Sequence, residues 1–378
     1  MFKVDPQGLR YSEGKIVSST FDRYLSICDR VVVVCREQKI CPSNTHLYML
    51  SSNCHVEFRA LRGVSWFSVF VRHGLHNFGL VRSVIRECSF LALRCPAFIS
   101  LMFFPSVLLE RRRYAVEVAG HAYDAVRSAT RGRFFSLPLS LIMHITTRFV
   151  VNKAVGAIYV TAGVLQRDYP CTGISAAASN VEIERSSSKV LDRRLEKLAP
   201  VKYEEFVIGV IGSFNNKYKG IDVLIKAVVE LKRKSVPVRL EVVGAGDEVN
   251  LGISDEVRDY IVLHGSLGRD DILEWLERID VYCQPSRTEG LPRALIEAMS
   301  RGCPAVATNV GGIPELLEDR YLCIPGDVDG LASLLMHVYE HGEERAAMAL
   351  RNFEFSHAFS NDVLSAKRLE FWNAVAEC

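Results

Sequence analysis

The sequence contains no pair of cysteines in the C-x-x-C spacing, although it has 11 cysteines. Their spacing is also irregular, which argues against a disulfide scaffold and against a zinc site built from cysteine pairs. Several cysteines lie inside apolar runs, where a free thiol behaves as a small hydrophobic side chain. No signal-peptide pattern opens the chain. We therefore expect a reducing compartment and a cytoplasmic protein.

Low-complexity tracts and obvious internal repeats are absent as well. The composition, 49% hydrophobic and 24% charged, is typical of a globular protein. A chain of 378 residues is long enough for two domains of ordinary size.

The longest apolar stretch, Cys88 to Leu109, has 22 residues and one charge, Arg94. Pro96, Pro105 and this central arginine fit a membrane-spanning helix poorly. We expect a buried strand, a turn at Pro96 and an apolar helix that ends at three arginines. A helix in the membrane interface is the alternative, and the segment 131–153, with Arg131 and Arg133 among aromatic and aliphatic residues, is a second candidate for this role.

The net charge of +2 conceals an uneven distribution. Residues 1–180 contain 22 Lys/Arg and 11 Asp/Glu, whereas residues 181–378 contain 24 and 33. A basic N-terminal half indicates an anionic partner, and acidic lipid, a lipid-diphosphate acceptor and nucleic acid all fit. Ordinary solvated arginines would produce the same pattern.

Short apolar runs alternate with helical patterns throughout the chain, which indicates an α/β fold with parallel sheets. We predict two doubly wound, Rossmann-like domains that face each other across a cleft. No apolar strand is expected before Phe21. The strands are expected at Val31–Cys35, Ser89–Arg94, Tyr114–Val118, Gly156–Val160, Phe206–Ile211, Val238–Val243, Ile261–Leu263, Val281–Gln284 and Ala305–Thr308. The expected domains are residues 1–183, a linker at 184–204, residues 205–355 and a terminal helical segment at 356–378.

Two glutamates flank the start of a predicted helix in the segment PSRTEGLPRALIEAMSRGCP. Pro292 suits the first helical position. Glu289 then lies just outside the helix N-terminus, and Glu297 lies about 7 Å further along the axis. Amides at a helix N-terminus bind phosphate or sugar oxygens, while carboxylates accept hydrogen bonds from hydroxyls. The pattern suits a nucleotide sugar, although a capping glutamate and a solvated glutamate would explain it equally well.

A second candidate site follows strand Phe206–Ile211, where the loop GSFNNKYKG leads into a helix. A strand, a glycine-containing loop and a helix N-terminus form a phosphate cradle. Lys219 can reach a diphosphate, with Lys217 and Ser213 nearby. The loop is not a P-loop, and it does not match G-x-G-x-x-G. Gly244 and Gly246 end the next strand, where a tight turn is the simpler explanation.

These motifs occur in a recognisable order: the KG loop, VVGAG, HGSL, and then DVYCQPSRTEGLPRALIEAMSRGCPAVATNVGGIPEL. From about Val207 to Leu317 the chain resembles the retaining nucleotide-sugar glycosyltransferases of GT-B fold, family four. The N-terminal half more loosely resembles the acceptor domain of polysaccharide-building members. The segment SAKRLEFWNAV resembles the family's final helix, which crosses back to the N-terminal domain.

The resemblance implies a role for each matching residue. Glu297 would bind the nucleotide ribose, and Glu289 would bind the transferred sugar with the N–H groups of Gly290 and Leu291. Lys219 would neutralise the leaving diphosphate near Gly212 and Ser213. Ser213 stands where family members commonly have arginine, and Lys217 would replace that cation. His121, from the acceptor domain, would contribute to catalysis, unless it is only a helix cap; Asp124 is a weaker candidate.

The resemblance further implies a retaining hexosyltransferase for capsule or lipopolysaccharide synthesis. It would act at the cytosolic membrane face on a lipid-linked or polysaccharide acceptor, without a cofactor or a nucleic-acid partner. We expect no metal at Asp327-Val328-Asp329, because Asp329 suits a helix N-cap. A nucleotide-sugar epimerase or phosphorylase, or a non-catalytic nucleotide-sugar-binding protein of the same fold, remains the alternative.

Overall fold

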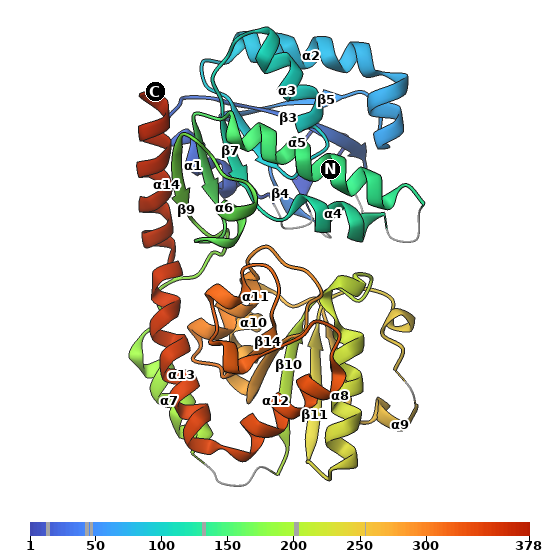
Figure 1. The fold of residues 1–378 in the computed structure, drawn as a ribbon, viewed down its shortest axis with the longest axis vertical. Helices are drawn as coiled ribbons and strands as arrows, with labels where there is room; N and C mark the ends of the chain where they lie inside the picture. The colour runs from blue at the N-terminus through green and yellow to red at the C-terminus, as the bar shows by residue number, and fades with distance from the viewer. Residues whose placement is uncertain (13–15, 42–44, 46–47, 131–133, 200–203, 254) are drawn as a thin grey trace. The chain divides into compact units, whose positions relative to one another are not determined.

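The computed structural model describes residues 1–378 except 13–15, 42–44, 46–47, 131–133, 200–203 and 254 (Figure 1). The chain forms two compact units. Unit 1 comprises Met1–Tyr159, Gln166–Ala177 and Ser365–Cys378, and unit 2 comprises Val160–Leu165 and Ala178–Leu364. The predicted boundaries differ from this division in detail, because the chain enters unit 2 briefly at Val160–Leu165 and returns to unit 1 before it continues.

Unit 2 alternates strands and helices along the chain. Its elements are α7 Ser188–Leu198, β10 Phe206–Ile211, η4 Lys217–Lys219, α8 Ile221–Arg233, β11 Val238–Val243, η5 Glu248–Leu251, α9 Asp255–Arg258, β12 Ile261–Gly265, α10 Arg269–Arg278, β13 Val281–Gln284, α11 Arg293–Ser300, β14 Ala305–Thr308, η6 Ile313–Glu315, η7 Asp319–Tyr321, β15 Leu322–Cys323, α12 Val328–Glu340, α13 Gly342–Ser356, η8 His357–Phe359 and the first residues of α14 Asn361–Ala376.

The sheet of unit 2 has six strands in the order β12-β11-β10-β13-β14-β15, and every neighbouring pair is parallel. Strands β13 and β14 are buried along their whole length, as expected for apolar runs covered by helices on both faces. Helix α8 packs against α12 and β11, whereas α11 packs against α13, which also contacts α7. The predicted linker at 184–204 therefore contains a helix that is part of unit 2; its residues 200–203 lie outside the described residues.

The strand order of unit 2 reverses between β10 and β13. The chain first adds β11 and β12 on one side of β10 and then returns to add β13 on the other side. In a doubly wound parallel sheet this reversal leaves a crevice at the carboxyl ends of the two central strands, where ligands bind. The segments that follow β10 and β13 are residues 212–220 and 285–292, and these contain the predicted phosphate cradle and the first glutamate.

Unit 1 contains one strand of nine residues, one of six and several of two to four. Its elements are β1 Phe2–Val4, β2 Arg10–Ser12, η1 Ser18–Phe21, α1 Asp22–Leu25, β3 Val31–Lys39, β4 Met49–Leu50, β5 Val56–Leu61, the π-helix η3 Ser68–Arg72, α2 Gly74–Glu87, β6 Ala92–Cys95, α3 Ser100–Leu109, β7 Ala115–Val118, α4 Ala122–Ala129, α5 Ser136–Asn152, β8 Gly156–Tyr159, the end of α6 Val164–Asp168, β9 Ile174–Ala177 and the rest of α14.

The strands of unit 1 form one sheet in the order β4-β2-β1-β3-β5 and a second, parallel sheet in the order β6-β7-β8-β9. The expectation of no strand before Phe21 is wrong. Strand β1 pairs in parallel with β3, and Phe2 is buried against Phe58. The sequence pattern of this strand is weak, because β1 has three residues and only one of them, Phe2, is buried.

The apolar stretch Cys88–Leu109 forms a strand followed by a helix, β6 and α3, as predicted, but β6 begins at Ala92, three residues later than expected. Among the described helices, none combines the length and the apolar character needed to cross a membrane.

Candidate functional site

The loop after β10 brings Lys219 to the start of α8. The single turn Lys217–Lys219 is followed by Gly220, whose φ of 70° lies in the left-handed region that favours glycine. A Cβ atom on Gly220 would lie 1.8 Å from the carbonyl oxygen of Pro285, the residue after β13. Glycine at this position therefore lets the two segments at the strand reversal touch.

An arginine fastens these two segments to each other. Arg287 donates to both carboxylate oxygens of Asp222 at 2.7 Å, and its backbone N–H donates to the carbonyl of Tyr218 at 2.7 Å. The Arg287 guanidinium lowers the pKa of Asp222, so that this carboxylate stays ionised. A paired, planar contact of this kind fixes orientation as well as distance. The Lys219 loop is thus held in position over the end of β13.

Glu289 meets Lys219 directly, with 2.7 Å between the Nζ and Oε1 atoms. The same Oε1 atom accepts from Ser286 Oγ at 2.9 Å and from Gln284 Nε2 at 3.2 Å. No described residue donates to the other oxygen, Oε2. The Glu289 side chain is 11% exposed and that of Lys219 is 22% exposed. One oxygen is therefore fixed by three donors, and the other remains able to accept a hydrogen bond from a ligand hydroxyl.

The backbone beside Glu289 is shaped by a pair of glycines after β14. Gly311 has a φ of 52°, and a Cβ atom there would lie 2.0 Å from the carbonyl oxygen of Glu289. The N–H of Gly312 donates to the carbonyl of Gly290 at 2.7 Å. The Gly290 carbonyl is thereby used within the protein. Within the described chain, the N–H groups of Gly290 and Leu291 have no acceptor, so these amides can bind a ligand.

Glu297 lies on α11, which begins at Arg293, so that Pro292 is the N-cap residue and not the first helical residue as predicted. The Glu297 side chain is half-buried, and no hydrogen bond or ion pair to it is found among the described residues. Burial raises its pKa; Arg293 and Arg269 oppose this shift, and Glu182 adds to it. A half-buried carboxylate that receives no hydrogen bond from the protein is suited to accept hydrogen bonds from the hydroxyl groups of a ligand.

The other predicted residues of the cradle surround the same loop. A Cβ atom on Gly244 would lie 2.1 Å from the carbonyl oxygen of Gly212, and one on Gly246 would lie 2.7 Å from Cβ of Phe214. These glycines let the loop after β11 pack against the loop after β10. Ser213 is half-buried and Lys217 is exposed. No side-chain hydrogen bond of either is found in the described part of the chain.

His121 belongs to unit 1, at the N-cap position of α4, where its side chain makes no capping bond. Its Nδ1 lies 3.2 Å from Asp124 and its Nε2 lies 3.5 Å from Asp168. Burial lowers the pKa of His121, but the two carboxylates outweigh this effect, and the net pKa lies above its ordinary value. Burial and the neighbouring His121 instead lower the pKa of His144. The pair thus favours one charged and one neutral ring.

Three residues of the site were not predicted from the sequence: Gln284, Ser286 and Arg287. Gln284 is the buried last residue of the apolar strand β13, and it accepts from Tyr282 Oη at 2.9 Å and donates to Ser286 Oγ at 2.8 Å. A polar residue at the carboxyl end of an otherwise apolar parallel strand is a signal that could have identified it. Nothing local in the sequence indicates that Arg287 pairs with a residue 65 positions away.

One further prediction is corrected by the structure. Asp327, and not Asp329, caps α12, because its side chain accepts from the backbone N–H of Gly330 at 2.9 Å. Asp327 and Gly330 are three residues apart, which is typical of a contact between an N-cap side chain and a backbone N–H of the first helical turn. Asp329 lies in the first turn of the helix, where an acidic side chain interacts favourably with the helix dipole.

Helix α5 in unit 1 carries five large apolar side chains on its solvent side. Exposed residues are Leu137, Leu141, Ile142, Ile145 and Phe149, each about half exposed. The buried face includes the small polar residues Ser136, Ser140 and Thr147. Exposed Arg148 and Lys153 lie at the C-terminal end of this apolar face; Arg131 and Arg133 lie outside the described residues. An apolar face of this size on a single helix is a common feature of surfaces that bind a partner or a membrane.

Comparison with known proteins agrees with this architecture. Residues 205–341 match the family model for glycosyl transferases group 1. The chain is 29% identical to Protein CapJ of Staphylococcus aureus over 322 residues, which are 83% of this chain and 78% of CapJ. It is 33% identical to the amylovoran biosynthesis glycosyltransferase AmsK of Erwinia amylovora, over 32% of this chain and 33% of AmsK. The match thus spans most of CapJ but about a third of AmsK.

Solved structures of similar fold extend over both units. HepE of Anabaena, solved in complex with UDP, superposes with a TM-score of 0.63 at 16% identity, covering 98% of this chain and 99% of HepE. Sucrose-phosphate synthase of Thermosynechococcus elongatus gives a TM-score of 0.63 at 15% identity, covering 86% of this chain and 84% of that chain. The chain therefore has the GT-B fold of two Rossmann-like domains, and its residues 205–341 match the group 1 glycosyltransferases in sequence.

Proposed function

We propose that this protein transfers a hexose-type sugar, with retention of anomeric configuration, from a nucleoside-diphosphate sugar to a lipid-linked or polysaccharide acceptor. We further propose that the transfer needs no metal ion and takes place at the cytosolic face of a membrane, in the synthesis of a capsule or similar polysaccharide. The observation that carries the proposal is the contact between Lys219 and Glu289 at the strand reversal of unit 2.

The charges at this contact match those that develop during sugar transfer. Breaking the anomeric bond leaves positive charge on the sugar and negative charge on the nucleoside diphosphate. A preorganised ammonium group next to the leaving diphosphate provides electrostatic stabilisation, usually the largest contribution to catalysis. Lys219 supplies this charge at the start of α8, where the helix dipole also favours an anion. A charge already supplied by the protein makes a metal ion unnecessary for this step.

The two glutamates would divide the hydroxyl groups of the substrate between them. Glu289 would accept from the transferred sugar through Oε2, while its Oε1 atom stays bound to Lys219, Ser286 and Gln284. The free N–H groups of Gly290 and Leu291 would donate to the oxygens of the sugar or diphosphate. Glu297 would accept from the ribose. The complexes of HepE with UDP and with UDP-glucose support a nucleotide sugar as the class of substrate.

The acceptor is inferred from unit 1 and from the relatives. AmsK is named for amylovoran biosynthesis, and WcaL of Salmonella typhimurium, 35% identical over 31% of this chain, is named for colanic acid biosynthesis. Phosphatidyl-myo-inositol mannosyltransferase of Mycolicibacterium smegmatis, 27% identical over 44% of this chain, is named for a lipid acceptor. The apolar face of α5, with Arg148 and Lys153 at its end, is complementary to an anionic membrane surface. His121, paired with two carboxylates, is the proposed catalytic group of this domain.

The donor is tested first by a thermal-shift screen of the wild-type protein with UDP-, GDP- and ADP-sugars, and then by transfer from the stabilising sugar nucleotide to membrane lipid extracts. We expect Glu289→Gln to lower the transfer rate at least tenfold, because the loss of one charge-assisted hydrogen bond costs about 1.5–3 kcal/mol. Exposed Glu354 in unit 2 provides the matched control, and Glu354→Gln is expected to keep the wild-type rate.

Five outcomes would contradict the proposal. A fully active Glu289→Gln variant would contradict the assignment of the site. A product with inverted anomeric configuration would contradict the proposed retention. Binding of the sugar nucleotide without transfer to any acceptor would indicate a non-catalytic binding protein, and an altered sugar formed from the donor alone would indicate an epimerase. A transfer rate that EDTA abolishes would contradict metal independence.

A further inference from the structure

Two histidines and a glutamate come together where α12 meets α13. His337 lies in the last turn of α12, His341 is the residue between the two helices, and Glu344 lies in the first turn of α13. Residues four apart on a helix share a face, and the two imidazole rings accordingly lie 4.1 Å apart between centroids. One ligand atom from each of the three side chains lies within 4.8 Å of the others.

Two of these groups, His341 and Glu344, are oriented by a second contact. His341 Nδ1 lies 2.8 Å from the carbonyl oxygen of His337, so that this nitrogen donates and Nε2 keeps its lone pair. Glu344 Oε1 accepts from Tyr321 Oη at 2.9 Å and lies 3.6 Å from Arg320. Its other oxygen, Oε2, is turned toward His337 Nε2 at 2.5 Å. Metal-binding histidines and carboxylates are commonly held in this way, with one atom bonded to the protein and the other directed at the metal.

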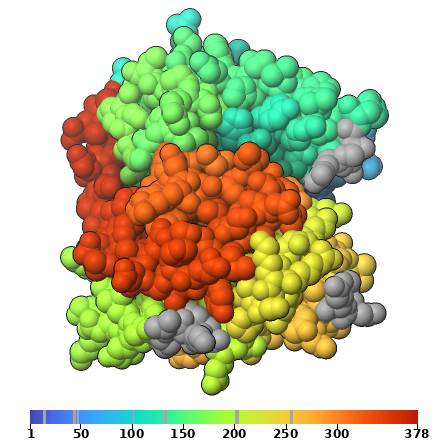
Figure 2. Space-filling view, turned by 60° about the horizontal axis from the view of Figure 1, so that its bottom comes forward, coloured from blue at the N-terminus to red at the C-terminus, as the bar shows by residue number. Residues whose placement is uncertain are grey.

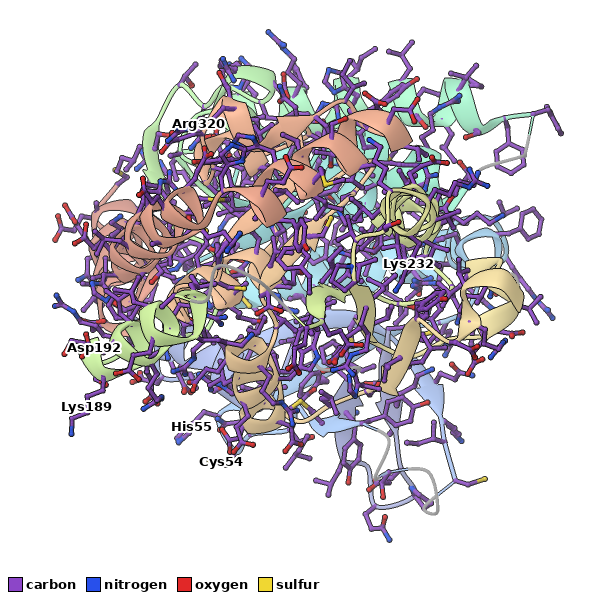
Figure 3. All side chains as sticks on the ribbon, turned by 90° about the horizontal axis from the view of Figure 1, so that it is seen from below. Cys54, His55, Lys189, Asp192, Lys232 and Arg320 are labelled. Atoms are coloured by element: carbon purple, nitrogen blue, oxygen red, sulfur yellow. The ribbon has the colours of Figure 1, made fainter. Side chains whose placement is uncertain are left out.

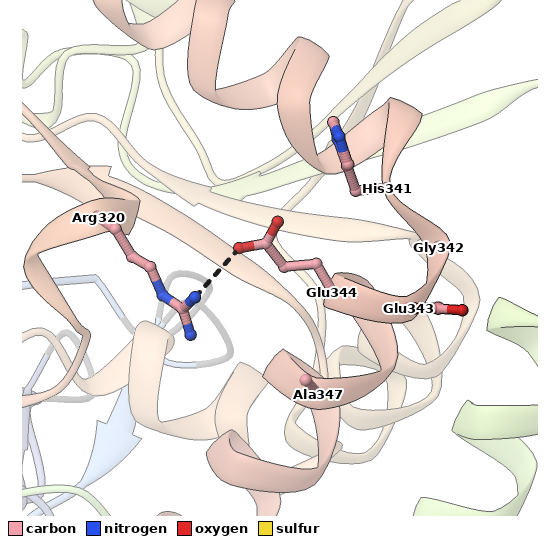
Figure 4. Close-up of a pocket in the computed structure, with 6 residues that line it drawn as sticks. All are labelled: Arg320, His341, Gly342, Glu343, Glu344 and Ala347. Carbon is pink, nitrogen blue, oxygen red and sulfur yellow. Dashed lines mark ion pairs between the residues drawn. The ribbon is translucent and has the colours of Figure 1, made fainter.

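The cluster is open to solvent and borders a hollow. His337 and His341 are exposed and Glu344 is half-buried. A cavity of about 540 Å³ lies beside it, lined by Arg320, His341, Gly342, Glu343, Glu344 and Ala347 (Figure 4). The orange and red surface in Figure 2 includes α12 and α13, and it faces solvent. A metal ion and its bound water can therefore reach the three side chains.

We propose that His337, His341 and Glu344 form a binding site for a divalent transition-metal ion, with Zn²⁺ as the favoured ion. Two imidazole nitrogens and one carboxylate oxygen are a ligand set that zinc uses with water in its fourth position. Imidazole ligands also favour such ions over Mg²⁺ or Ca²⁺, which prefer oxygen. The ion would replace the present contact between His337 and Glu344 and bridge their two helices.

The site is separate from the residues of the proposed function. None of its three ligands lies in the loops after β10 or β13, which carry Lys219 and Glu289. The expected effect is structural, because a metal bound by the folded chain and not by the unfolded chain raises the melting temperature. Cysteine spacing in the sequence does not bear on this site, because its ligands are histidine and glutamate.

The test uses the full chain without a histidine tag, treated with chelator and then titrated calorimetrically with zinc sulfate, with magnesium sulfate as comparison. We expect one zinc ion to bind per chain and magnesium to bind at least tenfold more weakly. His337→Ala, His341→Ala and Glu344→Gln should each weaken zinc binding at least tenfold, because even the loss of an outer-shell partner costs 10–100-fold. Cobalt(II) bound to the wild-type protein should give the visible absorption of a nitrogen–oxygen site.

Two matched variants serve as controls. Glu343→Gln changes the exposed neighbouring carboxylate at the cavity, and His55→Ala changes an exposed histidine of unit 1, labelled in Figure 3, whose side chain points away from the ribbon. Both should bind zinc as the wild type does. The proposal would be overturned if the three ligand variants bound zinc as tightly as the wild type does. It would also be overturned if cobalt(II) gave no such absorption with the wild-type protein, a result that does not depend on whether every variant folds. The thermal shift with a sugar nucleotide should persist in His341→Ala, which separates this result from the proposed transfer.

Discussion

Lys219 carries the positive charge on which the proposed chemistry depends. Lys219→Gln keeps a side chain of similar length but removes that charge. Because a charge-assisted hydrogen bond contributes about 1.5–3 kcal/mol and about 1.4 kcal/mol corresponds to a tenfold change, we expect kcat to fall at least tenfold. Steady-state transfer kinetics measure the change. Lys234→Gln, at an exposed position after the same helix α8, should leave kcat unaltered; an equal loss there would mean a general effect of charge.

The ionised carboxylate of Glu297 should lower the free energy of unfolding at neutral pH. Burial raises its pKa, so the folded chain prefers the protonated carboxyl more strongly than the unfolded chain does. The ionised form therefore lowers the free energy of unfolding above the raised pKa. This cost disappears as the pH falls below the ordinary value of glutamate, about 4.3. We expect Glu297→Gln to raise the melting temperature at pH 7, with a gain that shrinks toward pH 4, when unfolding is followed across this range.

The same substitution should abolish stabilisation by the sugar nucleotide, because an amide accepts hydroxyl hydrogen bonds more weakly than a carboxylate does. Stability and binding would then change in opposite directions. A variant that is less stable than the wild type at pH 7 would show that Glu297 has a structural partner in place of a ligand. Glu354→Gln, on exposed surface, should alter neither property.

At the scale of single residues, local sequence identified Glu289 and Lys219 but not their support. A glutamate before a helix and a lysine in a strand–loop–helix segment are recognisable from neighbouring residues. The contacts of Glu289 with Gln284 and Ser286 depend on how the end of β13 turns. The contact of Arg287 with Asp222 joins the loop after β13 to the first turn of α8. Such contacts are properties of the packed molecule, and no local pattern encodes them.

At the scale of elements, α5 should bind membranes through its apolar face. We expect the wild-type protein to sediment with vesicles containing anionic phospholipid and less with neutral vesicles. Binding should weaken as salt rises, because charge attraction by Arg148 and Lys153 is screened over about 8–10 Å. Ile142→Glu with Ile145→Glu places two charges on the half-exposed apolar positions and should remove binding.

Leu350→Glu provides the control for this experiment. Leu350 is 44% exposed on α13 in unit 2, so the variant adds a negative charge on apolar surface elsewhere. It should sediment as the wild type does. Unchanged sedimentation of the α5 variant would exclude a membrane as the partner of this face.

Elements of unit 2 were predicted more accurately than those of unit 1. Strands β10, β11, β13 and β14 begin and end as expected, because each is a largely buried, mostly apolar run bounded by polar or turn residues. The short strands β1, β2 and β4 were missed. They have two or three residues each, and none has more than one buried position, so no buried apolar run marks them in the sequence.

At the scale of the molecule, the end of the chain completes the core of unit 1. Trp372 on α14 is fully buried, and its ring contacts those of Tyr24, Phe90 and Phe371. We expect Trp372→Ala to lower the free energy of unfolding by about 3–5 kcal/mol through the cavity it leaves. Hydrogen exchange should show lost protection in the peptides of unit 1, while those of unit 2 keep theirs.

Leu369→Ala tests the specificity of that result, because Leu369 lies on the same helix and is 42% exposed. It should change the unfolding free energy by less than about 0.5 kcal/mol. Equal loss of protection in both units of Trp372→Ala would show that they unfold together.

The sequence by itself determined the class of the fold, the alternation of strands and helices, and the two charged residues of the proposed donor site. Periodicity, apolar runs and turn residues act over a few neighbouring positions, so they can be read without a structure. The order of the strands was decided only in the tertiary structure. It places β13 beside β10, and it thereby brings together Lys219 and Glu289, which are 70 residues apart. Their meeting depends on which strands pack side by side, a choice made by the whole core and not by either loop.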